Sequence, residues 1–330
     1  MPKFLLLRFS SIGDIVLTSP VVRCLKQQVP DAEVHFLTRK PFEPVLKNNP
    51  YIDRLFLFDR HVSDVIDSLR NENYDAVIDL HNNRRSFLVK RALKRPSHSF
   101  RKLNIEKWLL VNLKWNRLPD LHIVDRYMET VSSFGVRNDG KGLDYFLGQE
   151  DGAVVETLPE SHRIGYIAIA IGAQHGTKRL PEARIGELCS QLKSPVVLLG
   201  GKEDAELGNR ISQLNGNVFN GCGRFKLNES AALVKHSRSV VTHDTGLMHI
   251  AAAFKRPVVS IWGNTVPAFG MTPYYGLATV AERRFEVTGL SCRPCSKIGF
   301  DKCPKSHFGC MNDQDIPAIA AAAETFAAAN

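Results

Sequence analysis

Polar residues of catalytic type follow several short apolar runs of the chain. The first run, residues 4–7, leads into a turn that contains Ser11, Gly13 and Asp14. Small residues at a strand-to-helix turn allow backbone amides to approach an anionic or hydroxylated ligand. Asp14 suits two roles at such a turn, a helix N-cap or a general base beside a cleft. The spacing alone leaves both roles open.

A second turn of this kind follows the apolar run at residues 164–171. It contains Thr177, Lys178 and Arg179, which suit the neutralisation of a diphosphate, and Pro181, which suits the first position of a helix. The Gly-x-x-x-x-Gly-Lys-Ser/Thr spacing of a P-loop is absent. A basic residue before a helix is common, so this turn indicates phosphate binding only together with others.

Two further strand ends carry acids. Glu203 follows a glycine pair, where an acid either accepts hydrogen bonds from ribose hydroxyls or favours the first turn of a helix. Asp244 is followed by Thr245, Gly246 and a helix of small residues, so the amides at this helix start predict a phosphate site. The alternatives are an N-cap for Asp244 and a buried core role for His249.

The seven cysteines of the chain divide into two groups. Four of them, Cys292, Cys295, Cys303 and Cys310, resemble a four-thiolate zinc site in residue type, although the later spacing is not that of a common zinc finger. Zinc, a redox pair and buried unligated thiols all remain open. Without an export signal a disulfide framework is not expected. The other three are expected in the core: Cys24, Cys189 and Cys222.

The formal charge of +9 is concentrated in residues 84–117, which interleave basic residues with Phe87, Trp108 and Trp115. The only acid in this segment is Glu106. Such a segment suits nucleic acid, anionic lipid headgroups or a phosphorylated substrate, and a solvated helix face is the alternative. Its basic residues are Arg84, Arg85, Lys90, Arg91, Lys94, Arg95, Arg101, Lys102, Lys107, Lys114 and Arg117.

Short apolar runs and segments of helical period alternate through the whole chain. Residues 4–7, 76–80 and 258–262 are typical of strands buried on both faces, while residues 15–28 and 182–192 have helical period. This alternation predicts an α/β protein with parallel sheets and helical crossovers. No apolar run reaches the roughly 18 residues of a membrane helix, and we expect a cytoplasmic protein.

The length of 330 residues and a Gly-rich polar passage near residues 139–152 favour two domains. The strand pattern restarts near residue 161, so we expect doubly wound domains at residues 1–155 and 156–330, with the last helix free to pack back on the first domain. In open α/β sheets ligands bind beyond the carboxyl ends of the strands. The active site is therefore expected in a cleft where two sets of strand ends face each other.

Taken in order, these motifs resemble the ADP-heptose–lipopolysaccharide heptosyltransferase family, glycosyltransferase family 9, whose members are inverting enzymes of the two-Rossmann GT-B fold. The resemblance spans nearly the full chain. It is carried by Ile12-Gly13-Asp14 with Thr18-Ser19-Pro20, Asp79-Leu80-His81 with Arg84-Arg85-Ser86, residues 177–181, Leu199-Gly200-Gly201 with Glu203, and above all residues 244–251. The chain departs from the family pattern in having Leu180 before Pro181 and Asn82-Asn83 where a Gln-Gly pair is frequent.

The resemblance implies a transfer of heptose or a related sugar from an ADP-activated donor, with Asp14 as the general base. Lys178 would hold the diphosphate and Glu203 the ribose. The remaining donor residues would be Asp244, Thr245, Gly246 and His249. No cofactor is implied for catalysis, since lysine and a helix start supply the positive charge, and a structural zinc ion at the four clustered cysteines is the one metal considered.

The implied acceptor is the lipopolysaccharide inner core with lipid A. The residues that would contact it are Ser11, Gly13, Asn82, Asn83, Arg84 and Arg85. The basic segment 84–117 would then bring the protein to the anionic inner membrane as a peripheral contact. A non-catalytic nucleotide- or nucleic-acid-binding α/β protein is the alternative, but acids at three strand ends would repel a polynucleotide, so no nucleic-acid partner is expected. An oxidoreductase lacks support because Gly-x-Gly-x-x-Gly is missing after the first strand.

Overall fold

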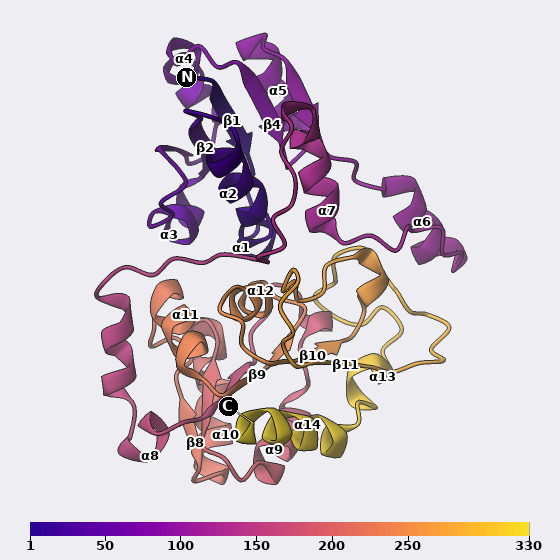
Figure 1. The fold of residues 1–330 in the computed structure, drawn as a ribbon. Coiled ribbons are helices and arrows are strands. Elements are labelled where there is room, and N and C mark those ends of the chain that lie inside the picture. The colour runs from indigo at the N-terminus through magenta and orange to yellow at the C-terminus, as the bar shows by residue number, and fades with distance from the viewer. Residues whose placement is uncertain (330) are drawn as a thin grey trace. The chain divides into compact units, whose positions relative to one another are not determined.

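A computed structural model describes residues 1–329 as two compact units, each built on its own parallel β-sheet (Figure 1). The first unit comprises residues 1–102, 121–146 and 276–278, and the second comprises residues 103–120, 147–275 and the chain from residue 279 onward. The expected boundary lay near residue 155. The observed division also assigns residues 103–120 to the second unit, so the basic segment 84–117 is shared between the two units.

The sheet of the first unit has the strand order β3-β2-β1-β4-β5, with all neighbours parallel. Its strands are β1 (Lys3–Leu7), β2 (Glu33–Arg39), β3 (Arg54–Phe58), β4 (Ala76–Asp79) and β5 (Ser97–Ser99). Its helices are α1 (Ile12–Val16), α2 (Ser19–Gln28), α3 (Glu43–Leu46), α4 (Ile66–Asn71), α5 (Arg84–Leu93) and α7 (Ile123–Met128), with 3-10 turns at Lys40–Phe42, Val62–Val65 and Glu129–Phe134. The strand order reverses between β1 and β4, which makes their carboxyl ends the switch point where ligands bind in such sheets.

The sheet of the second unit has the order β11-β10-β9-β6-β7-β8, again parallel throughout. Its strands are β6 (Ile167–Ala170), β7 (Val196–Leu199), β8 (Val218–Asn220), β9 (Ser239–His243), β10 (Val258–Trp262) and β11 (Glu282–Glu286). Its helices are α6 (Asn104–Leu113), α8 (Glu160–Arg163), α9 (Glu182–Gln191), α10 (Ala205–Leu214), α11 (Leu227–His236), α12 (Gly246–Ala253), α13 (Gly309–Asn312) and α14 (Ile316–Ala328), with 3-10 turns at Asp151–Thr157, Gly176–Lys178, Lys202–Asp204 and Pro267–Phe269. Here the switch point lies between β6 and β9.

Helices cover both faces of the second sheet. Helices α9, α10 and α14 lie together on one face, and α11 and α12 pack together on the other (Figure 1). The last helix, α14, buries Ile316, Ile319 and Ala323 in the core of its own unit. Its small alanine side chains allow this close approach. The three isolated cysteines are buried, as expected.

Two element boundaries differ from the sequence expectation. The expected helix 15–28 is two helices, because Pro20, in the first turn of α2, cannot donate the backbone hydrogen bond that would continue α1. The expected strand 164–171 begins only at Ile167, since Gly165 has a φ of +143° that breaks the extended run. None of the described helices is long and apolar enough to cross a membrane.

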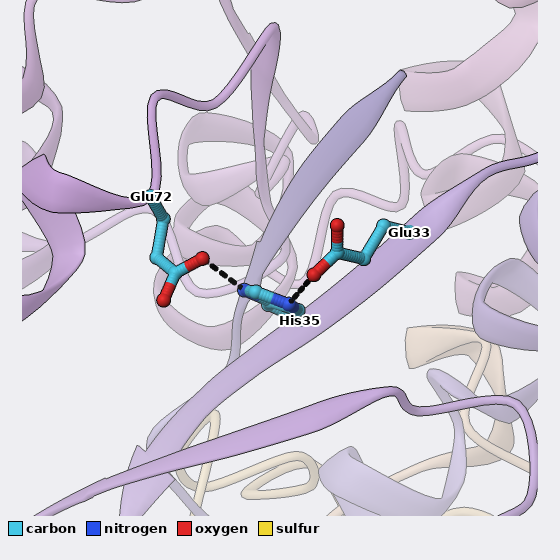
Figure 2. A group of neighbouring side chains, drawn as sticks. All are labelled: Glu33, His35 and Glu72. Atoms are coloured by element: carbon cyan, nitrogen blue, oxygen red, sulfur yellow. Dashed lines mark hydrogen bonds and ion pairs between the residues drawn. The ribbon is translucent and has the colours of Figure 1, made fainter. Parts of the chain in front are cut away.

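A charged group lies near the amino ends of the first unit's strands. His35 is buried, and Figure 2 shows its ring between the carboxylates of Glu33 and Glu72. Lys3 pairs with both carboxylates, at 3.1 and 2.8 Å, and Arg54 also pairs with Glu72. Glu33, His35 and Glu72 are of metal-ligating type. However, the negative charge of the two carboxylates is already neutralised by Lys3 and Arg54. These ion pairs therefore link β1, β2 and the end of α4 at the amino ends of the strands, whereas Asp14 lies at the carboxyl end of β1.

Acid unfolding should report on Arg23, the buried cation that joins α2 to residues 139–144. Its guanidinium binds Asp139 through two bonds, of 2.7 and 2.8 Å, and also pairs with Asp144. The bonds from Arg23 lower the pKa of Asp139 from 3.8 to about 2, so this contribution to stability is complete above about pH 4 and lost as the pH falls through 2. We expect Asp139→Asn to lower the free energy of unfolding at pH 7 by about 2 kcal/mol, measured by urea titration at several pH values.

The control for this variant is Asp67→Asn. Asp67 pairs with Arg70 but is 90% exposed, and exposed pairs contribute little. The difference in stability between Asp139→Asn and the unmodified protein should narrow as the pH falls toward 2. A difference that stayed constant with pH would contradict the assignment.

Candidate functional site

Asp14 lies in the first turn of α1, directly after β1. Its carboxylate accepts hydrogen bonds from the backbone amide and hydroxyl of Ser11, at 3.1 and 2.8 Å, and pairs with Arg8 at 2.6 Å. Ser11 is the N-cap of α1 and Asp14 the third residue of the capping box, so the N-cap alternative for Asp14 is replaced by this related role. Gly13 is buried within the same turn. The carboxylate is thus fixed in place at the carboxyl end of β1.

Arg8 is one of the residues that the sequence interpretation missed. Its guanidinium donates to the carbonyl oxygens of Ser10 at 2.8 Å and Leu80 at 2.6 Å, and to the hydroxyl of Tyr127 at 2.8 Å. These bonds connect the ends of β1 and β4 at the switch point. A permanently charged guanidinium at this distance favours the ionised form of a carboxylate, which is the form that a general base requires. The available signal was an arginine at the end of an otherwise apolar strand.

The turn after β4 completes the site in the first unit. The ring of His81 lies 4.8 Å from that of Phe9, and burial, assisted by the charges of Arg8 and Lys102, lowers the pKa of His81 to about 4. His81 is therefore neutral at pH 7. Lys102 also interacts electrostatically with Asp14, so a second cation lies near this carboxylate. The sequence interpretation counted Lys102 only as part of the basic segment 84–117.

The asparagines predicted to contact the acceptor also shape this turn. Asn82 has a φ of +48° and donates from its side chain to the carbonyl of Phe100 at 3.0 Å. Asn83 is the N-cap of α5 and accepts from the amide of Ser86 at 3.0 Å. Arg84 and Arg85 follow as exposed residues in the first turn of α5. Asn82 and Asn83 thus have structural hydrogen bonds, whereas the two arginines extend from the surface beside them.

In the second unit, Lys178 and Asp244 come together at the switch point. Lys178 lies in residues 172–181 after β6, which are named the donor turn because the sequence resemblance implies donor binding there, and Asp244 follows β9. The ammonium of Lys178 lies 2.6 Å from the Asp244 carboxylate and also donates to the Asp244 carbonyl at 3.2 Å. Thr265, which follows β10, donates to the same carboxylate at 2.9 Å. Three neighbouring strand ends thus hold one lysine at a fixed position.

His243, the last residue of β9, is hydrogen-bonded to the backbone of the donor turn. Its Nε2 accepts a hydrogen bond from the amide of Leu180 at 3.0 Å. Burial, together with the charge of Arg179, lowers the pKa of His243 to about 3, so the ring is neutral and can accept this bond at pH 7. This role was missed because a histidine at the end of a buried strand carries no distinctive pattern.

Arg179 and Asp204 form a second link between strand ends. Asp204 is buried, pairs with Arg179 at 2.7 Å and accepts from the amide of Gly201 at 2.8 Å. Glu203, the predicted ribose ligand, is 66% exposed and lies 4.0 Å from Arg179. The structure therefore separates the two adjacent acids, with Asp204 holding the turn and Glu203 left accessible to solvent.

The start of α12 has the predicted form. Thr245 is its N-cap, with extended backbone, and Gly246 is its first residue. The first amides of a helix have no partner within the helix and carry the positive end of its dipole. His249 is buried within α12. The helix start and Lys178 are therefore both placed at the carboxyl end of β9, an arrangement that suits a diphosphate.

Three of the four clustered cysteines lie between the end of β11 and α13, and Cys310 lies within α13. Cys310 is buried and the others are partly exposed. The Sγ atom of Cys292 lies 3.7 Å from Nε2 of His307. No three of the four sulfur atoms lie within 4.8 Å of one another.

Comparisons with known proteins agree on one family and one fold. The sequence profile of glycosyltransferase family 9 (heptosyltransferase) matches residues 62–297. Lipopolysaccharide heptosyltransferase 1 of Campylobacter coli is 28% identical over 295 residues, which are 80% of this chain and 84% of that protein.

Solved structures share the two-sheet architecture. A family 9 glycosyl transferase from Veillonella parvula has a TM-score of 0.77 at 21% identity, covering 100% of this chain and 98% of its own. The ADP-heptose lps heptosyltransferase II of E. coli has a TM-score of 0.68 at 23% identity, covering 98% and 99%. The expected GT-B class of α/β fold is thereby confirmed.

Proposed function

Because the chain belongs to glycosyltransferase family 9, the heptosyltransferase family, we propose that this glycosyltransferase moves a heptose from ADP-heptose to a lipopolysaccharide inner-core or lipid A acceptor. The observation that carries the proposal is the juxtaposition of Lys178 with the start of α12 at the switch point of the second sheet. A cation and free helix amides at one strand edge form a site for a diphosphate.

The proposed reaction is a single displacement. The carboxylate of Asp14 takes the proton of an acceptor hydroxyl while its oxygen attacks the anomeric carbon of the donor sugar. The bond from this carbon to the diphosphate oxygen breaks, and the negative charge that develops there is stabilised by Lys178 and by the amides of Thr245 and Gly246. Attack opposite the leaving group inverts the anomeric centre.

Asp244 has a defined part in this reaction. In the structure its carboxylate is the partner of Lys178, and Thr265 holds it there. A diphosphate has the same charge sign and acceptor atoms, so it would share or replace Asp244 as the ligand of the lysine. The pair thus keeps Lys178 ordered before the donor binds. Glu203, accessible at the neighbouring strand end, is the proposed ribose ligand.

We propose that the transfer itself requires no cofactor. In this chain the positive charge for the departing diphosphate is proposed to come from Lys178 and the start of α12. A zinc ion at the four clustered cysteines is accordingly proposed as a structural ion, away from the bond that is made.

Transfer should be tested directly with defined substrates. The protein would be incubated with ADP-heptose and a heptose-free lipopolysaccharide core, with GDP- and UDP-sugars as alternative donors. We expect release of ADP and a product with the anomeric configuration opposite to that of the donor, as observed by NMR. Retained configuration would refute the single displacement, and absence of transfer with every donor would refute the function.

We also propose a peripheral contact with anionic membrane. In the first unit, helix α5 exposes Phe87 and Leu88 beside Arg84, Arg85 and Arg91. In the second unit, helix α6 exposes its own apolar residues, Ile105 and Trp108 among them. Aromatic and aliphatic side chains ringed by arginines suit an interface with anionic headgroups.

Vesicle sedimentation across a salt series would test this contact. We expect binding to phosphatidylglycerol-containing vesicles that weakens with salt and falls roughly tenfold when Phe87 and Leu88 are both changed to serine. The matched control is Leu214→Ser, a change to an 83% exposed leucine at the end of α10. Salt-insensitive binding, or equal loss in the control, would count against the contact.

A further inference from the structure

The cysteine segment, defined as residues 287–310, is irregular and weakly packed. Residues 287–308, all within the described part of the chain, form neither helix nor strand, and α13 begins only at Gly309. Ile298 is 62% exposed and Phe300 40% exposed, so the middle of the segment buries little apolar surface. A long irregular segment with so little burial requires another source of order.

This segment is bonded directly to the donor turn. The amide and hydroxyl of Thr177 both donate to the carbonyl of Phe300, each at 3.0 Å, and the amide of Phe300 donates to the Thr177 hydroxyl at 2.8 Å. The backbones touch at the preceding residue as well, because a Cβ at Gly176 would lie 2.1 Å from the carbonyl oxygen of Asp301. Thr177 immediately precedes Lys178. The cysteine segment therefore fixes the backbone that carries the proposed diphosphate ligand.

The segment also holds the turn after β10. The amide of Cys295 donates to the carbonyl of Asn264 at 3.2 Å, and the guanidinium of Arg293 donates to the carbonyls of Gly263 and Thr265, the latter at 3.0 Å. Thr265 in turn donates to Asp244, the partner of Lys178. The backbone next to Lys178 and the turn that carries Thr265, the partner of Asp244, are thus both held by hydrogen bonds from the cysteine segment.

Apolar packing does not maintain this contact. A cavity of about 400 Å³ lies between the donor turn and the segment, lined by Gly176, Thr177, Asp301, Cys303 and Phe308 among others. The hydrogen bonds of Thr177 therefore cross the edge of an open space. An ordering interaction elsewhere in the segment would therefore stabilise Phe300 at this position.

The thiols supply a suitable set of ligands. Cys295 lies near enough to Cys292 and Cys303 to interact with them electrostatically, and Cys310 lies near enough to all three of the other cysteines. Four thiolates from a Cys-x2-Cys pair and two later cysteines are a ligand set that zinc prefers. The sulfur atoms are more widely spaced than in a closed site, so an ion would draw them together and order the segment between them.

His307 complements this set without joining it. Its Nδ1 accepts a hydrogen bond from the amide of Gly309 at 2.9 Å, so the proton of the neutral ring is on Nε2. That N–H faces the sulfur of Cys292 at 3.7 Å. The ring is thus oriented to donate to a thiolate rather than to bind the metal. Lys114 adds positive charge beside the same cysteines, donating to the carbonyls of Cys292 and Pro294.

We propose that the four cysteines bind one zinc ion, and that this ion, by ordering the cysteine segment, holds the donor turn in the shape that binds the diphosphate. Metal occupancy then sets the affinity of the enzyme for its nucleotide. The inference rests on the proposed donor role of Lys178. It extends that role by assigning control of the donor site to a metal remote from the chemistry.

The metal site is tested first. Zinc content of the full-length protein, purified under reducing conditions, should be one ion per chain by elemental analysis, and cobalt substitution should give the absorption of a tetrahedral thiolate site. Cys303→Ser should reduce the content sharply, whereas Lys305→Ala, a change in the same segment without a thiol, should leave it unchanged. No stoichiometric uptake of zinc or cobalt, or equal uptake by Cys303→Ser, would refute the site.

The coupling is tested by comparing protein with zinc, after chelation, and after zinc is restored. We expect chelation to raise the Kd for ADP about tenfold, which is the size of effect expected when the hydrogen bonds at Thr177 are lost. We also expect chelation to accelerate hydrogen exchange at the amides of Thr177 and Phe300. Restored zinc should reverse both changes in the unmodified protein but not in Cys303→Ser. Equal ADP affinity and equal exchange with and without zinc would refute the coupling.

These two measurements also separate this inference from the proposed function. Hydrogen exchange requires no nucleotide. If zinc protects Thr177 and Phe300 but the loaded protein binds no ADP, the donor assignment fails while the ordering by metal stands. If ADP binds equally well in both states, the donor assignment stands and the control by metal fails.

Discussion

Replacing Asp14 by asparagine is expected to lower kcat by about 10²–10⁴-fold, the usual contribution of a general base. An amide cannot accept the proton of the acceptor hydroxyl, yet it preserves the size of the side chain and much of its bonding to Ser11. Arg8 keeps its three other acceptors, at Ser10, Leu80 and Tyr127, so the turn should remain folded. Initial-rate measurements with saturating donor and acceptor would give the change.

Nucleotide affinity provides the internal check for this variant. All of the proposed diphosphate ligands belong to the second unit, so the Kd for ADP from calorimetry should be unchanged. Asp64→Asn, which alters an exposed acid in the first turn of a different short helix, is the matched control and should retain full activity. Near-normal kcat in Asp14→Asn with intact ADP binding would remove Asp14 from the mechanism.

Replacing Lys178 by methionine is expected to reduce kcat/KM by about 10²–10³-fold, because one preorganised positive group that stabilises the departing diphosphate is lost. The side chain keeps its length but not its charge. The same variant leaves the carboxylate of Asp244 partly buried and without its cation, 13% exposed, which should also lower the unfolding temperature. Steady-state kinetics and thermal unfolding would be measured together.

A double variant separates these two effects. Lys178→Met combined with Asp244→Asn removes both charges, so stability should recover while activity stays low. Lys202→Met, a change to an exposed lysine after the neighbouring strand β7, should alter neither quantity. If activity recovered along with stability in the double variant, Lys178 would act only through the local fold.

The fold class could be predicted because buried parallel strands leave a strong local pattern. Residues 4–7 and 258–262 are predominantly apolar on both faces, and each is a strand within one residue of the expected bounds. The edges of the sheets were harder. Strand β5 is only Ser97–Ser99, and β11 carries Glu282 and Arg284, so neither has the apolar run that marks a central strand. Edge strands have one exposed side and tolerate polar residues.

The site could be predicted only in part. Asp14, Lys178 and the start of α12 were predicted because each lies in a strand-to-helix turn that follows an apolar run. Arg8 and Thr265 were not, because their importance comes from partners far away in sequence, Leu80 for the former and Asp244 for the latter. For Asn83 the structure shows a helix cap, and the acceptor contact that its type and position predicted stays a prediction.

Sequence by itself therefore determined which strand ends carry the candidate site residues, since apolar periodicity and strand-to-helix turns are local properties. Tertiary structure decided how those ends are held. Only the parallel pairing of β6 with β9 brings Lys178 beside Asp244, and only the folded path of the cysteine segment brings Phe300 to Thr177. Charge pairing and hydrogen bonding act over a few ångströms in space, whereas 66 and 123 residues separate these partners along the chain.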